Sequence, residues 1–119
     1  MQNKAAICNR LETLIRYYQE FKNLTDGISL EGYRSNLMLK RAIERQIQLI
    51  VECATDINQM ILKGLGNEPS KDYFNSFVDL ANAGVIDMQF ALDIAASTGL
   101  RNVLVHEYQT IDDEIALTP

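Results

Sequence analysis

The chain has 119 residues and a mass of 13.5 kDa, the size of one compact domain. Hydrophobic residues make up 47% and charged residues 23%, which excludes a disordered or low-complexity chain. The longest stretches without a charged side chain, residues 80–86 and 94–100, are far shorter than the ~20 apolar residues of a transmembrane helix. We therefore expect residues 1–119 to form a single folded domain that crosses no membrane.

The first residues lack the continuous apolar core of a secretory signal, which favours a cytoplasmic location. Cys8 and Cys53 lie far apart, each on an expected apolar helix face, so no disulfide is expected. One histidine and two isolated cysteines provide no spaced ligand set for zinc, and no loop resembles a calcium or Gly-rich phosphate site. The sequence therefore implies no metal or nucleotide cofactor.

Charge is divided unevenly along the chain, whose net charge is −5. Residues 1–66 have a net charge of +2 and residues 67–119 of −7. A basic cluster lies in the first part and contains only Glu44 as an acidic member, its cations being Arg34, Lys40, Arg41 and Arg45. Two interpretations are open: most simply a solvated helix face, or a concentration of positive charge that could contact RNA phosphates.

Helical spacing dominates the first two thirds of the chain. A helix is expected over residues 3–24, ending at Thr25-Asp26-Gly27. A second helix is expected from about Tyr33 to Lys63, a segment without Pro or Gly that would be about 45 Å long. The apolar stripe of the first helix is Ile7, Leu11, Leu14, Tyr18 and Phe21, and that of the second is Ile43, Ile47, Ile50, Ala54, Ile57 and Ile61.

Shorter helices are expected after the loop at residues 64–69, whose glycines and proline end the long helix. Ser70 is the expected N-cap of a helix that ends at Gly84, and Asp87 caps the next, with Phe90, Ala91, Ile94 and Ala95 facing inward. No segment shows the alternation of a strand. The predicted fold is all-α, a four- or five-helix up-and-down bundle with one very long second helix.

A long second helix would project past its shorter neighbours, which favours self-association as a homodimer. Its apolar stripe could build the core of the bundle or also seat a partner chain, and spacing alone does not choose between them.

Chemically useful residues are concentrated in one segment, where Arg101 precedes the single histidine, His106, and Tyr108 follows it. An imidazole moves protons near neutral pH, and a guanidinium provides paired donors for phosphate oxygens. These residue types suit phosphodiester chemistry. A packed, hydrogen-bonded histidine and an ion-paired arginine are the competing interpretation.

The spacing Arg101-x4-His106-x-Tyr108 matches the R-x4-H-x-Y signature of the HEPN superfamily. The chain resembles in particular the HepT-like toxins, which are paired with a minimal nucleotidyltransferase antitoxin. The order of helices and the segments 72–87 and 100–114 share this resemblance, so it covers nearly the whole chain.

The resemblance implies a metal-independent endoribonuclease toxin that acts as a homodimer. Arg101 and His106 would be the catalytic pair and Asn102 a polar helper, while Tyr108 would be the position that the nucleotidyltransferase modifies with AMP. For Tyr108, a packed ring with a hydrated hydroxyl is the alternative.

Elementary chemistry connects the dimer with catalysis. Metal-free RNA cleavage needs both a base and an acid, and each chain has one imidazole, so a twofold axis near His106 would supply two. On one ideal helix Arg101 and His106 lie about 140° apart, so they converge only where the helix ends or where two chains meet. A non-catalytic module that binds a nucleotidyltransferase or a nucleotide is the alternative function, and a purely structural scaffold is a third.

Overall fold

The computed structural model describes residues 4–96 and residue 99, and every regular element in these ranges is helical. The all-α fold predicted from the sequence is confirmed. No helix in this part of the chain is long and apolar enough to cross a membrane. The helices are α1 (Lys4–Thr25), α2 (Leu30–Ser35), α3 (Leu37–Gly64) and α4 (Tyr73–Asn82), followed by helical residues 88–96.

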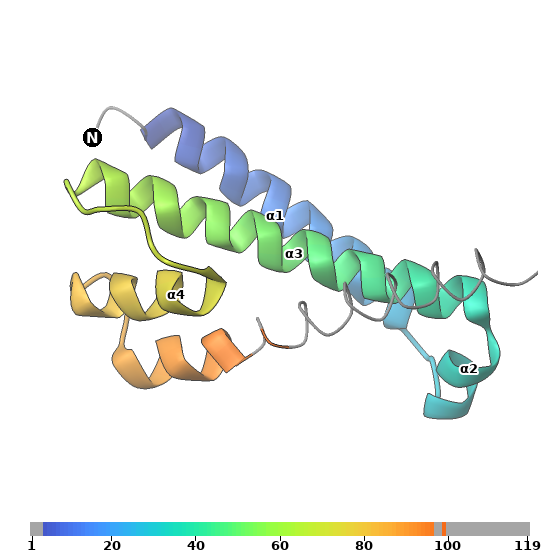
Figure 1. Ribbon diagram of the computed structural model, residues 1–119. Coiled ribbons are helices and arrows are strands. Elements are labelled where there is room, and N and C mark those ends of the chain that lie inside the picture. Colours follow the sequence, from blue (N-terminus) through green and yellow to red (C-terminus); the bar gives the residue numbers. More distant parts are fainter. Residues whose placement is uncertain (1–3, 97–98, 100–119) are drawn as a thin grey trace, which may run out of the picture.

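Helix α3 is the spine of the fold. Its 28 residues extend about 42 Å, close to the length expected from the sequence. Helix α1 runs antiparallel along one side of α3, whereas α4 and residues 88–96 lie on the other side (Figure 1). The short helix α2 packs against α3 near its first residues (Figure 1).

The first core cluster joins α1 to α3. It consists of Ile7, Cys53 and Ile57, with Leu14, Tyr17, Met60 and Ile61 packed against them. The predicted stripe of α1 is wrong at Leu11 and Tyr18, which are 41% and 54% exposed. The apolar residues of this stripe are spread over a broad arc around the α1 axis. Helix α3 packs against only the part of that arc nearest Tyr17.

The second core cluster joins α4 and residues 88–96 to the opposite side of α3. Ala91 and Ala95 are completely buried against Phe77. Small side chains let this segment approach α4 closely, whereas Phe90, which was expected to face inward, is 54% exposed. The predicted N-cap Asp87 is confirmed, since its carboxylate accepts the N–H of Phe90 at 3.2 Å.

The N-cap predicted for α4 is wrong by two residues. Asp72 caps this helix, accepting the N–H of Asn75 at 2.8 Å. Ser70 instead donates its hydroxyl to the Asp79 carboxylate at 2.7 Å, so it ties the preceding loop to the middle of α4. Asp72 stands immediately before the first helical residue, where a carboxylate can reach the free N–H groups of the first turn.

The long helix begins four residues later than Tyr33, the start expected from the sequence. Asn36 has an extended backbone, and its side chain accepts the N–H of Leu39 at 3.1 Å. Its own N–H donates to the Gly32 carbonyl at 3.2 Å. Asn36 therefore ends α2 and begins α3, so residues 33–35 belong to a separate short helix.

The two cysteines have different environments. Cys53 is buried, as expected, and donates its thiol to the Arg10 carbonyl at 3.5 Å. Burial raises the pKa of the Cys53 thiol; Arg10 partly opposes this and Asp56 adds to it. Cys8, expected on the apolar face of its helix, is exposed instead. Both thiols are free.

Replacing the cap of α3 should destabilise the fold. Asn36→Ala should lower the free energy of unfolding by about 1 kcal/mol, because the first turn loses a hydrogen-bond acceptor. Urea denaturation followed by far-UV circular dichroism, at one fixed protein concentration, measures the change. Asn23→Ala, at an exposed position within α1, is the control and should cause no loss. Equal losses in the two variants would contradict the capping role.

The two thiols should react at different rates with iodoacetamide. The native protein should gain one carbamidomethyl group quickly, at Cys8, because the Cys53 thiol is buried and its pKa is raised. Mass spectrometry of peptides from native and urea-unfolded samples locates the groups. Modification of Cys53 in the native protein as rapid as that of Cys8 would show that this packing is wrong.

Candidate functional site

A buried carboxylate stands at the centre of a polar cluster on α3. The side chain of Glu44 is 1% exposed, and its Oε1 accepts the hydroxyl of Tyr33 at 3.3 Å. Lys40 Nζ lies 3.9 Å from Oε1, and Arg41 Nη1 lies 3.8 Å from Oε2. Tyr33, Lys40, Arg41 and Glu44 form what we call the Glu44 cluster, in which two cations compensate one buried negative charge.

The local sequence explains how α2 reaches this cluster. Ser29 caps α2 by accepting the N–H of Gly32 at 3.0 Å. Gly32 permits this close approach, because a Cβ there would lie only 3.2 Å from the Ser29 hydroxyl oxygen. The break at Asn36 then lets α2 pack against α3, so that the hydroxyl of Tyr33 meets Glu44.

The basic cluster predicted from the sequence divides into two kinds of residue. The side chains of Lys40 and Arg41 are 31% and 29% exposed and pair with Glu44, so they are not part of a simple solvated face. Arg34 and Arg45 are exposed, as a solvated face requires. Arg45 also donates to the Gln48 side chain at 3.3 Å.

The Glu44 cluster was not predicted from the sequence. Its signal was present, because Lys40 and Arg41 precede Glu44 by four and three residues, the spacing at which side chains meet on a helix. The hydrogen bond from Tyr33 to Glu44 could not be predicted from this spacing, because Tyr33 was expected to be part of the same continuous helix as Glu44.

The predicted catalytic residues Arg101, Asn102 and His106 and the predicted modification site Tyr108 lie outside the described residues. Their assignment stays a prediction. The last continuous run of described residues, 88–96, is helical and stops five positions before Arg101, and Ala95 anchors this run in the second core cluster.

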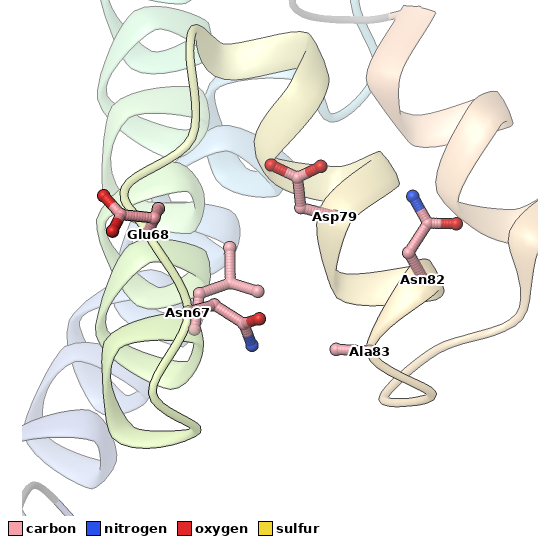
Figure 2. A pocket seen from close by; sticks show the side chains of 6 residues that line it. Asn67, Glu68, Asp79, Asn82 and Ala83 are labelled. Carbon is pink, nitrogen blue, oxygen red and sulfur yellow. The ribbon is translucent and has the colours of Figure 1, made fainter.

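A cavity of about 330 Å³ lies between the end of α3, the following loop and α4. Figure 2 shows its side chains, which include the carboxylates Glu68 and Asp79 and the amides Asn67 and Asn82. No basic side chain is among its described lining residues. Two carboxylates repel a phosphate, so this cavity does not suit an RNA backbone.

Acidic and sulfur side chains are dispersed over the described ranges. Within residues 4–96, no group of three or more His, Cys, Asp or Glu side chains is arranged to hold a metal ion. The Glu44 cluster has two cations beside one buried carboxylate, a surplus of one positive charge, which favours contact with anions.

Comparisons with known proteins place the chain in a family. The model of the ribonuclease HepT-like family matches residues 14–118. The tRNA nuclease HepT of Aphanizomenon flos-aquae is 41% identical over 103 residues, which are 87% of this chain and 69% of that protein.

Two proteins of Archaeoglobus fulgidus, each named "Putative RNase", are also similar. One is 40% identical over 68 residues, covering 57% of this chain and 51% of the relative. The other is 35% identical over 86 residues, covering 72% and 64%. The family match includes the segment that contains Arg101, His106 and Tyr108, and it extends over most of the chain. The chain therefore belongs to the HepT-like ribonuclease family, and the endoribonuclease class predicted from its sequence is confirmed at the level of that family.

Proposed function

We propose that the chain is a toxin endoribonuclease that cleaves RNA without a metal ion, in a cleft shared by two copies of the chain. The observation that supports this is the match to the ribonuclease family over residues 14–118, which contain the Arg101-x4-His106 spacing. One relative is named a tRNA nuclease, so tRNA is the first substrate to test. Such a substrate is consistent with a cytoplasmic location and with one helical domain over residues 1–119.

Cleavage in this proposal uses the 2′-hydroxyl of RNA as the nucleophile. The His106 imidazole of one chain takes the 2′-OH proton, and the 2′-oxygen attacks the adjacent phosphorus. The bond from phosphorus to the 5′-oxygen breaks, and the second chain's His106 gives that oxygen a proton. Arg101 stabilises the charge that develops on the phosphoryl oxygens, and Asn102 assists as a polar helper. The products are a 2′,3′-cyclic phosphate and a 5′-hydroxyl.

Two copies are required because each chain has a single histidine. One imidazole cannot be deprotonated as the base and protonated as the acid at the same moment. A twofold axis near His106 supplies both forms in one cleft and brings two copies of Arg101 with them.

The partner in this proposal is a minimal nucleotidyltransferase antitoxin that adds AMP to Tyr108. Its position, two residues after His106, would place the added phosphate where an RNA phosphate must approach Arg101. Like-charge repulsion and the bulk of the nucleotide would then prevent substrate binding.

Removing either member of the catalytic pair should abolish cleavage. His106→Ala and Arg101→Ala should each lower the rate on purified tRNA by at least about 100-fold in the presence of EDTA. Helicity and mass by light scattering should stay unchanged. Arg16→Ala, at an exposed position on α1, is the control for loss of a positive charge. Full activity in both motif variants would defeat the proposal, and a non-catalytic binding module would then be the better interpretation.

AMP addition should depend on a single phenol. After co-expression with a minimal nucleotidyltransferase, intact mass should increase by whole AMP units, and Tyr108→Phe should remove the increase because it lacks the acceptor oxygen. Tyr18→Phe is the control, since Tyr18 is an exposed tyrosine on α1 and should leave modification intact. An AMP-modified Tyr108→Phe protein would refute the assignment.

A further inference from the structure

Two segments near opposite ends of α3 have opposite net charge. Residues 30–45, which include α2 and the start of α3, have a net charge of +2. Residues 67–96, which include α4, contain five carboxylates and one lysine and have a net charge of −4. Helix α2 lies beside the N-terminal end of α3, whereas the loop that leads to α4 starts from the C-terminal end of α3 (Figure 1).

Backbone electrostatics add to the charge at the α2 end. Helix α3 begins there, so its free N–H groups and the positive end of its dipole point to the same region as the basic side chains. The last turn of α1, which contains Lys22, lies near this end as well (Figure 1). We call Lys22, Arg34, Lys40, Arg41 and Arg45 the basic end.

The buried Glu44 carboxylate holds two side chains of the basic end in place. It is buried and pairs with Lys40 and Arg41, which limits the freedom of these two side chains. Residues 22–45 also contain the carboxylates Asp26 and Glu31, and with Glu44 these leave a net charge of +2. Arg34 and Arg45 are exposed. Holding long cations in place before a ligand arrives lowers the entropy cost of binding that ligand.

We propose that the basic end binds the phosphate backbone of the RNA substrate, with Arg34 and Arg45 as the exposed contacts. This inference rests on the proposed ribonuclease function and adds a substrate-holding surface apart from Arg101 and His106. An acidic chain repels RNA as a whole, so it needs a local surface of opposite sign. The contacts are to phosphates and therefore read no bases.

The test measures binding rather than cleavage, so that it can fail independently of the catalytic assignment. The probe is a fluorescent 2′-O-methylated 20-nucleotide RNA of mixed sequence, which has no free 2′-hydroxyl. Fluorescence anisotropy at several salt concentrations gives the affinity and its salt dependence. The variants are Arg34→Gln/Arg45→Gln and, with charge retained, Arg34→Lys/Arg45→Lys.

The matched control is Lys63→Gln/Lys71→Gln, which removes the same total charge. Both lysines are exposed, and Lys63 is on the same side of α3 as Arg45, five helical turns away, at a distance of about 27 Å.

The double glutamine variant should bind about tenfold more weakly at low salt, and the slope of log affinity against log salt should fall by about 1.4 for two lost phosphate contacts. The double lysine variant and the control should retain most of the affinity. Equal weakening in the glutamine variant and the control would mean that only net charge matters, and this would overturn the proposal. Unchanged binding in the glutamine variant, or no RNA binding by the unaltered chain, would overturn it as well.

Discussion

The fold depends on the burial of α3 on several of its sides. Helix α1 covers one side, α4 and residues 88–96 cover another, and α2 packs near its start. A helix enclosed in this way cannot place all its polar residues in water, so each buried polar group needs a partner. Gln46 donates to the Tyr17 carbonyl and to Glu20, both at 2.9 Å, and Asn58 donates to Ser76 at 3.0 Å. These bonds fix the register of α1 and α4 against the spine, while apolar packing supplies most of the stability.

Much of the helical framework could be predicted because its signals are local. The long helix, the glycine-rich stop after it and the cap at Asp87 follow from spacing, from residues that cannot continue a helix and from side chains that cap its first turn. The break at Asn36 was missed because residues 33–63 contain no Pro or Gly that would mark it. A cap in such a segment is visible only through its hydrogen bonds. The buried part of the α1 stripe could not be predicted, because it depends on how α1 packs against α3. This packing places Tyr17 against the core and leaves Tyr18 exposed.

The candidate site shows the same division. Residue types and their spacing predict the Arg101-x4-His106 pair, whose role stays a prediction, and the family match supports the class of reaction. The spacing could not reveal Glu44 as a buried anchor, because burial depends on elements distant in sequence. The basic residues were visible in the sequence, but only the structure separates the pair held by Glu44 from the exposed Arg34 and Arg45.

The proposed function has to be carried out by a chain with one histidine and a net negative charge. For the proposed reaction, a small acidic chain with one imidazole has to hold a polyanion and supply both a base and an acid. In the proposed enzyme two separate features meet these needs: the basic end concentrates positive charge, and a twofold axis doubles the catalytic groups.

Subunit mixing tests the shared cleft most directly. Unaltered chains and His106→Ala chains are unfolded together in equal amounts, refolded, and assayed at one total concentration. If each cleft needs two imidazoles, only dimers of two unaltered chains are active, and about a quarter of the full activity should remain. Half of the activity would mean that each subunit cleaves RNA with its own histidine, which would contradict the shared site.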